Sequence, residues 1–226
     1  SSAASDVYKR QILPLAVVIA VGYLTVMKVI PIAAAQGFLA AFDELMLAGV
    51  LYGLGTFLFL ILLKWTLVGR YRPRAEPMWT PFVWKSEAVT SLYESIAVPN
   101  FFNFLRATPW LPLALRCMGA RIGKRVFMDT TDITEYDCVL IGDDAGLHAW
   151  SGPQTHLFED RVMKIGPVHI GRGVNVGPRS TILYDTHVEE RAVLGPLTLV
   201  LKGETIPAGQ AWMGSPATPW TRGPGA

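Results

Sequence analysis

One histidine of this chain lies among side chains suited to acid–base chemistry. His156 stands in the string Gln154-Thr155-His156-Leu157-Phe158-Glu159-Asp160-Arg161, with two carboxylates and an arginine close by. An imidazole accepts protons near neutral pH, and a carboxylate can fix its tautomer and stabilise the imidazolium. We therefore predict that His156 is a general base, oriented by Glu159 or Asp160, with a structural or exposed histidine as the alternative. Thr155 and Arg161 are candidate substrate contacts, because a guanidinium can hold a phosphate or a carboxylate.

The remaining polar candidates favour structural interpretations. His169 and His187 each precede an aliphatic residue of the repeat described below, so their side chains should point outward. An acidic stretch contains Glu135, Asp137, Asp143 and Asp144, which solvated turns would explain. Cys117 and Cys138 form no close pair and no metal-binding spacing, which favours buried, reduced thiols and predicts no metal site.

A six-residue period positions these groups. An aliphatic residue occurs at every sixth position from 170 to 206, and a small or β-branched residue stands two positions before most of them. This period fits neither an α-helix nor a simple strand, and it is typical of a hexapeptide parallel β-helix, which we expect to be left-handed. Three units form one coil, so the aliphatic residues should stack in columns inside a prism. The seven aliphatic positions are Ile170, Val176, Ile182, Val188, Leu194, Val200 and Ile206.

The same repeat extends backwards with interruptions. Ile122, Ile141 and Ile165 are each followed by glycine, as several of the later aliphatic residues are. Pro153 and Glu159 fall where aliphatic residues are expected. The segment 148–164 is therefore predicted to leave the prism and loop outward, and such departures often carry function.

The first part of the chain predicts a membrane hairpin. Half of all residues (51%) are hydrophobic, and Leu45–Leu63 contains no charged side chain. As a helix this stretch could cross about 30 Å of hydrocarbon, whereas a buried core helix is the alternative. A first span over Ile12–Ala35 contains Lys28, which must reach the interface or find a partner. The segment Gln36–Glu44 should be a short outside loop.

Charges at the ends of the spans predict the orientation. Arg70, Arg72 and Arg74 directly follow the second span, and Lys9 and Arg10 precede the first. The positive-inside rule then places both chain ends, and the β-helix, in the cytoplasm. Residues 1–11 have the look of a translated adapter, which implies that the chain is a fragment of a longer protein. The net charge of +2 gives no reason to invoke nucleic acid.

An aromatic connector separates the membrane hairpin (12–69) from the β-helix (119–220). Residues 70–118 are rich in Trp, Phe and Tyr. Ser86 to Ile96 should form a helix with Ser86 as N-cap, ended by Pro99 and followed by a short helical turn over Phe101–Arg106. Such a segment could lie at the membrane interface or cap the open first coil of the prism, and we expect both.

Three strings carry a family resemblance. They are Glu135-Tyr136-Asp137 with Ile141-Gly142-Asp143, the segment from Thr155 to Lys164, and Trp212-Met213-Gly214-Ser215-Pro216-Ala217. Together, over roughly residues 12–220, they resemble the non-ribosomal peptide synthetase terminal domain family, as in ε-poly-lysine synthetase-like enzymes. The last string alone is shared by hexapeptide-repeat acyltransferases in general.

The resemblance implies a membrane-tethered acyltransferase module of a larger synthetase. Such a module would join an aminoacyl group, held as a phosphopantetheine thioester on a carrier domain, to an amine acceptor. Backbone N–H groups would stabilise the oxyanion, and Glu135, Asp137 and Trp212 become further candidate substrate contacts. The expected partners are the carrier domain, the membrane and tandem or homotrimeric copies of the module. We expect no tightly bound cofactor, and a multi-pass protein of the bacterial inner (cytoplasmic) membrane.

Two alternatives stay open. The module could be an ordinary acyltransferase that uses acyl-CoA as donor. It could also be a non-catalytic scaffold within a set of tandem modules.

Overall fold

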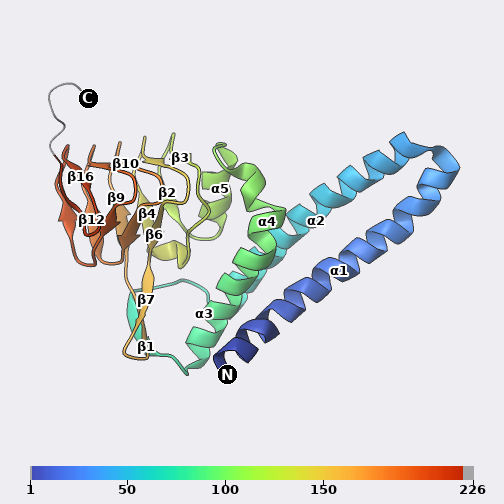
Figure 1. Ribbon diagram of the computed structural model, residues 1–226, viewed down its shortest axis with the longest axis horizontal. Coiled ribbons are helices and arrows are strands. Elements are labelled where there is room, and N and C mark those ends of the chain that lie inside the picture. Colours follow the sequence, from blue (N-terminus) through green and yellow to red (C-terminus); the bar gives the residue numbers. More distant parts are fainter. Residues whose placement is uncertain (1, 221–226) are drawn as a thin grey trace.

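The computed structural model describes residues 2–220, and the side chains of residues 2–15, 17 and 18 are outside that description. Two long helices are followed by a helical connector and then by a stack of short strands (Figure 1). The predicted adapter, residues 1–11, includes Lys9 and Arg10, and the side chains of this segment lie outside the described residues. It therefore stays a prediction.

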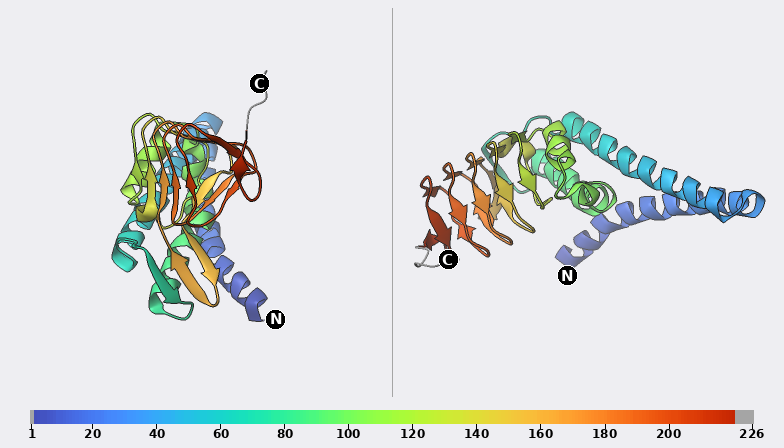
Figure 2. Two further views of the ribbon diagram at one scale, coloured as in Figure 1. Left: turned by 90° about the vertical axis from the view of Figure 1, so that its left-hand side faces the viewer. Right: turned by 90° about the horizontal axis from the view of Figure 1, so that it is seen from above.

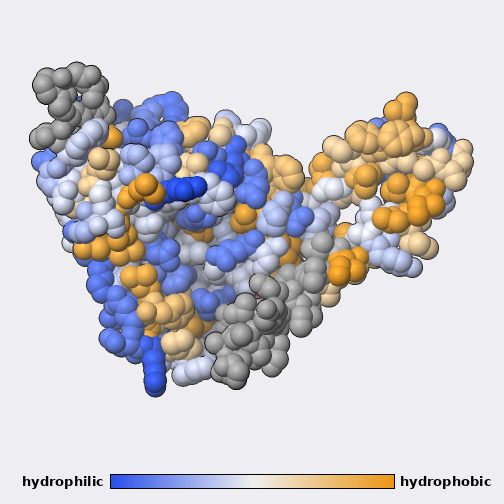
Figure 3. All heavy atoms as spheres, viewed as in Figure 1, coloured by the Kyte–Doolittle hydropathy of each residue, from blue (hydrophilic) through white to orange (hydrophobic). Residues whose placement is uncertain are grey.

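The first two helices form an antiparallel hairpin. Helix α1 spans Ser2–Gln36 and helix α2 spans Phe38–Leu67, with only Gly37 between them. Both are long and apolar enough to cross a membrane, and apolar residues gather at the far end of the hairpin (Figure 3). The expected loop over 36–44 is wrong, because α2 begins at Phe38. Lys28 does find a partner, since its Nζ lies 3.2 Å from Glu44 Oε2 across the hairpin.

The connector is one nearly continuous helical run with a short strand before it. Thr80, not Ser86, is the N-cap, because its hydroxyl accepts the Val83 N–H. Ser86 instead lies buried within the helix and donates to Tyr71 Oη over 3.2 Å. Pro99 does not end the run, because it falls in the first turn of a new helix, where no N–H is needed. The elements are β1 (Arg74–Pro77), α3 (Pro81–Leu92), the π-helix η1 (Tyr93–Ala97), α4 (Val98–Asn100), the 3₁₀ helix η2 (Phe102–Leu105) and α5 (Trp110–Cys117).

This connector joins the hairpin to the prism. Phe57 of α2 stacks on Phe101 with ring centroids 4.4 Å apart. A Cβ on Gly53 would lie only 2.5 Å from the Asn100 carbonyl oxygen, so glycine permits this close approach. On the other side Tyr93 packs edge-to-face on Tyr136 at 5.6 Å. The prediction that the connector packs on the first coil is confirmed.

The rest of the chain is a parallel β-helix whose left-handed sense stays a prediction. Its coils stack along one axis, and the helical hairpin of α1 and α2 projects from the end opposite the C-terminus (Figure 2). The strands are β2 (Arg121–Ile122), β3 (Phe127–Met128), β4 (Val139–Ile141), β5 (Gly146–Leu147), β6 (Gly152–Gln154), β9 (Val168–Ile170), β10 (Asn175–Val176), β11 (Thr181–Leu183), β12 (Thr186–Val188), β13 (Val193–Leu194), β14 (Leu199–Val200), β15 (Thr205–Ile206), β16 (Ala211–Met213) and β17 (Thr218–Pro219); the 3₁₀ helix η3 (Tyr136–Cys138) lies before β4.

The strand register confirms the predicted columns. Three faces follow the strand orders β15-β12-β9-β4-β2, β17-β16-β13-β10-β5-β3 and β14-β11-β6. Val188 pairs with Ile170 and Ile206, and Ile182 pairs with Val200. All seven aliphatic residues of the uninterrupted repeat are at most 2% exposed. They therefore form the prism core, whose stability comes from removing these side chains from water.

The interruption takes the form of a β-hairpin. Strands β7 (His156–Glu159) and β8 (Val162–Ile165) pair with each other, and β1 of the connector pairs with β8. The departure from the prism is narrower than predicted. Residues 152–154 stay in the third face, where Pro153 occupies the column position opposite Ile182.

The two cysteines differ in environment. Both are free, but Cys117 is exposed, so the prediction that both thiols are buried is wrong for Cys117. Cys138 is buried as predicted, and burial together with the charges of Glu135 and Asp137 raises its pKa to about 12.

Candidate active site

The hairpin brings His156 against a buried carboxylate. His156 is the first residue of β7, and its Nδ1 lies 2.8 Å from Oε2 of Glu135, a residue of the preceding coil. The His156 side chain is 12% exposed and the Glu135 side chain is fully buried. A carboxylate at this distance accepts a hydrogen bond from Nδ1–H, which leaves the lone pair on Nε2.

The Glu135 carboxylate has a fixed position. Thr155, which is fully buried, donates its hydroxyl to the same Oε2 over 2.7 Å. The Glu135 backbone is in the left-handed region at φ 39°, which a non-glycine residue adopts only under constraint. Oε1 is buried and has no hydrogen-bond partner in the described part of the chain. The arrangement therefore presents one carboxylate oxygen to the imidazole and keeps the group out of water.

Two opposing effects set the pKa of His156. Burial by itself lowers it, because the charged imidazolium loses solvation. The hydrogen bond and the charge of Glu135, with the charges of Glu87 and Glu94, outweigh burial, so the net pKa lies above the usual value of 6.5. His156 is thus a stronger base than a histidine in water.

A cavity of about 560 Å³ opens beside His156 between the connector and the prism. Its walls carry the carboxylates of Glu87, Glu94 and Asp132, and no Lys or Arg is among the described residues that line it. Burial raises the pKa of Glu94, and the charges of Glu87 and Asp132 raise it further. Trp150 and Phe158 contribute aromatic surface. Such walls favour a ligand that is positively charged and partly apolar.

The predicted orienting carboxylates lie elsewhere. Glu159 forms ion pairs with Lys164 at 2.8 Å and with Lys202 at 2.6 Å, which tie the hairpin to a turn of the prism. Hydrogen bonds from both lysines lower the pKa of Glu159 to about 2. Asp160 is an exposed residue at the hairpin turn. The prediction that Glu159 or Asp160 holds His156 is wrong, and Glu135 occupies that position.

Some of the candidate substrate contacts lie near His156, and others do not. Thr155 lies beside Glu135 and His156, whereas Arg161 is exposed at the turn of the β-hairpin. Asp137 is bonded to Lys64 and the Tyr71 N–H rather than placed in the cavity. Trp212 lies in the last coil, where its indole N–H donates to Gln210. Of the candidate contacts, the structure thus brings only Thr155 and Glu135 to His156.

The role of Glu135 was not visible in the sequence. Its place in the acidic stretch indicates a substrate contact or a solvated turn residue. Its pairing with His156 joins residues 21 positions apart on successive coils. The coil step that they span pairs Ile122 with Ile141, 19 positions later rather than 18, so a fixed six-residue count does not place the two side chains together.

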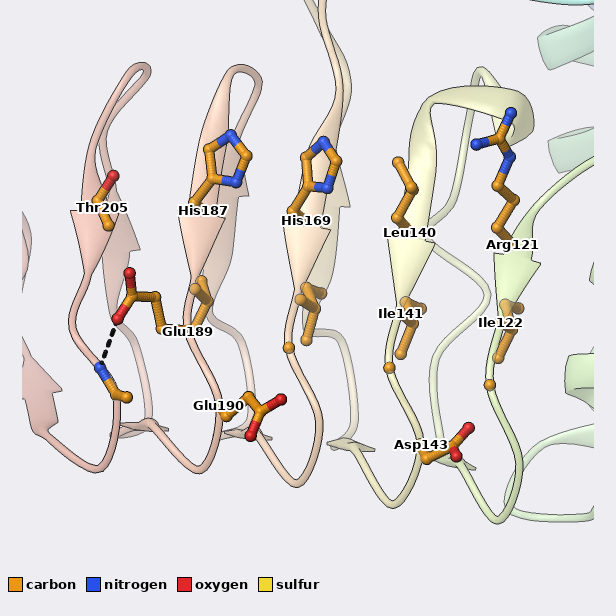
Figure 4. A pocket seen from close by; sticks show the side chains of 16 residues that line it. Arg121, Ile122, Leu140, Ile141, Asp143, His169, His187, Glu189, Glu190 and Thr205 are labelled. Carbon is orange, nitrogen blue, oxygen red and sulfur yellow. Dashed lines mark hydrogen bonds between the residues drawn. The ribbon is translucent and has the colours of Figure 1, made fainter.

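A larger hollow of about 880 Å³ lies on another face, across β2, β4, β9, β12 and β15 (Figure 4). His169 and His187 project outward there, as predicted, and their rings stack with centroids 4.4 Å apart. Glu189 accepts the Ala208 N–H over 3.0 Å at its edge. Burial, the neighbouring His187 and Arg121 lower the pKa of His169. Although this hollow is larger, the described residues that line it include no buried histidine–carboxylate pair.

Comparison with known proteins gives one sequence relative at high identity. The Delta-poly-L-ornithine synthetase of Acinetobacter baumannii (strain AB307-0294) is 60% identical over 211 residues, which is 93% of this chain and 16% of that protein. The chain therefore corresponds to a small part of its relative. This similarity is consistent with the synthetase resemblance of the sequence motifs. No family model matches the chain.

Solved structures that align with this chain include two acetyltransferases. A hexapeptide-repeat acetyltransferase from Vibrio cholerae aligns with 46% of this chain and 62% of its own, at 19% identity and a TM-score of 0.39. A serine acetyltransferase from Brucella abortus strain S19 aligns with 93% of this chain and 73% of its own, at 12% identity and a TM-score of 0.41.

Proposed function

We propose that this chain is an acyltransferase module that forms an amide bond between an aminoacyl thioester and an amine. The observation that carries the proposal is the 2.8 Å contact between His156 Nδ1 and the buried Glu135 carboxylate, beside an acid-lined cavity. The 60% identity to a segment of a poly-ornithine synthetase supports it.

In this mechanism the acceptor amine attacks the thioester carbonyl. The C–N bond forms as His156 Nε2 takes the proton from the amine nitrogen. Glu135 holds Nδ1–H and stabilises the imidazolium that results. The C–S bond then breaks, and His156 returns the proton to the leaving thiolate, so amide and thiol are the products. Backbone N–H groups as oxyanion donors stay a prediction.

The cavity walls support a cationic acceptor. The relative is named for poly-ornithine, and ornithine carries two amino groups. One amine could remain protonated near Glu87, Glu94 and Asp132 while the other, uncharged, approaches His156. The donor would be an aminoacyl group on the phosphopantetheine of a carrier domain, and we propose no other cofactor.

The helical hairpin would tether this site to a membrane. Helices α1 and α2 are long and apolar enough to span it, and Arg70, Arg72 and Arg74 favour a cytoplasmic position for the prism. We propose a multi-pass protein of the bacterial inner membrane, in which tandem or homotrimeric copies of a left-handed prism lie side by side.

The test is amide formation by the chain reconstituted in lipid. Ornithinyl thioester on a carrier domain is the donor, and free ornithine is the acceptor. His156→Ala should lower the rate by about 100-fold or more, whereas the matched change His187→Ala on the other face should leave it unchanged. Equal rates for wild type and His156→Ala, or no turnover by the folded wild type, would contradict the proposal.

Two further arms of the same assay separate the alternatives. An acyl-CoA that replaces the carrier thioester at equal rate would indicate an ordinary acyl-CoA-dependent transferase. A wild-type protein without turnover on either donor would indicate the non-catalytic scaffold.

A further inference from the structure

A buried ion pair lies where the second long helix meets the prism. Lys64 is the first charged residue after the uncharged stretch Leu45–Leu63, and its side chain is fully buried. Its Nζ lies 2.6 Å from Oδ2 of Asp137, whose side chain is 7% exposed. The same oxygen accepts the Tyr71 N–H over 3.1 Å, and Arg70 Nε lies 3.7 Å from the other carboxylate oxygen.

Asp137 is connected to the His156 site by one turn of backbone. It lies in η3, which begins directly after Glu135, and the Cys138 N–H donates to the Glu135 carbonyl over 2.8 Å. Glu135 itself is in the left-handed region at φ 39°, which is uncommon for a non-glycine residue. A displacement of Asp137 would therefore be transmitted to the Glu135 carboxylate.

The loop is held at both ends. Before Glu135, the Tyr93 hydroxyl donates to the Thr131 carbonyl over 2.7 Å. After it, Lys64 and the Tyr71 N–H bind Asp137. On the remaining side a Cβ on Gly119, which has φ +115°, would lie 2.6 Å from Asp137 Oδ1. The Asp137 carboxylate thus has little freedom to move.

Stability alone is a poor explanation for this pair. Removing two charges from water costs several kcal/mol per ion, so an apolar pair of similar volume is often at least as stable. A buried ion pair does restrict the relative position of two elements, because moving them apart would leave each charge buried without its partner. Here the two elements are the end of α2 and the loop that carries Glu135.

We propose that Lys64 and Asp137 are positioning residues, which fix the Glu135 carboxylate against His156 by anchoring its loop to the end of the apolar helix α2. The inference rests on the proposed function only for its consequence in catalysis. The geometric part, that the ion pair sets the contact between Glu135 and His156, can be tested without any substrate.

The experiment compares Lys64→Met, Asp137→Asn and the double variant with wild type and Glu135→Gln. The 226-residue chain is labelled with [¹³C,¹⁵N]histidine in detergent micelles, and the His156 ring is titrated by NMR. Each single variant should move the His156 midpoint down, toward that of Glu135→Gln, because the loss of the Glu135 contact leaves burial as the dominant effect. The double variant should also move it down, because it too lacks the contact that anchors the Glu135 loop to α2, although it leaves neither partner charge unpaired.

Controls separate positioning from mere stability. Arg125→Gln breaks an exposed ion pair with Asp144 and should leave the midpoint unchanged. A His156 midpoint that stays at the wild-type value in the folded variants, while melting temperature falls, would overturn the inference. If a single variant does not fold, the double variant, which leaves neither Lys64 nor Asp137 as an unpaired buried charge, still decides.

Turnover then distinguishes this inference from the proposed function. If both hold, the variants lower kcat and leave KM for ornithine unchanged, because the cavity walls are not altered. If the midpoint moves but His156→Ala does not reduce turnover, the positioning role stands and the catalytic role of His156 fails. If the midpoint does not move but His156→Ala abolishes turnover, the opposite holds.

Discussion

The β-hairpin that carries His156 and the prism face that carries His169 and His187 show together what turns a histidine into a base. His156 is largely buried beside the Glu135 carboxylate, and its pKa is raised. His169 stacks on His187 in the wider hollow, and its pKa is lowered by burial and by the neighbouring positive groups. The larger hollow therefore does not mark the better site. A fixed carboxylate partner, rather than volume or the number of histidines, distinguishes the two regions.

The largest effect should come from removing that partner. Glu135→Gln keeps the shape of the side chain but loses the charge that stabilises the imidazolium, so amide formation should fall by at least about tenfold. The acid limb of the pH–rate profile of this variant should also move to lower pH. Glu189→Gln, at the edge of the other hollow, should change neither. Equal rates for the two variants in the reconstituted assay would remove the distinction between the two regions.

A smaller effect should come from the hydroxyl that supports the carboxylate. Thr155→Val removes the donor to Glu135 Oε2 and leaves a buried acceptor short of one hydrogen bond, which should cost about 1–3 kcal/mol of unfolding free energy. Thr198→Val removes a buried hydroxyl that donates to the Gly195 carbonyl in the prism, at a similar cost. Denaturant unfolding measures both.

Of the two threonine variants, only Thr155→Val should lower turnover as well, because Thr155 touches the Glu135 carboxylate and Thr198 does not. If Thr198→Val lowered the rate equally at equal stability loss, the Thr155 contact would have no specific role.

The smallest effect should come from the opposite pKa shifts of His156 and His169. His156 has a folded-state pKa above 6.5, so protonation favours its folded environment; this contribution is fully present below pH 6.5 and is lost as pH rises through the folded pKa. His169 has a folded-state pKa below 6.5, so its contribution is present above pH 6.5 and is lost as pH falls through that pKa. NMR titration of the labelled rings should place the two midpoints on opposite sides of 6.5. Midpoints on the same side would remove the electrostatic difference.

The sequence determined the repeating and continuous parts of this protein. An aliphatic residue at every sixth position requires a coil that returns after three units, because only that geometry buries the whole column. The uncharged stretch Leu45–Leu63 likewise requires a long apolar helix. The break in the repeat predicted the outward segment, and the histidine within it predicted the candidate base.

Which side chains meet depends on the tertiary structure. Glu159 and Asp160 are close to His156 in sequence, but strand alternation and the hairpin turn direct them to Lys202 and to solvent. Glu135 reaches His156 from the preceding coil, and Lys64 reaches Asp137 across 73 positions of the chain. Periodicity reports the face on which a residue lies, because it reflects burial. It does not report the partner, since the partner depends on coil stacking and on the length of the segment inserted between coils.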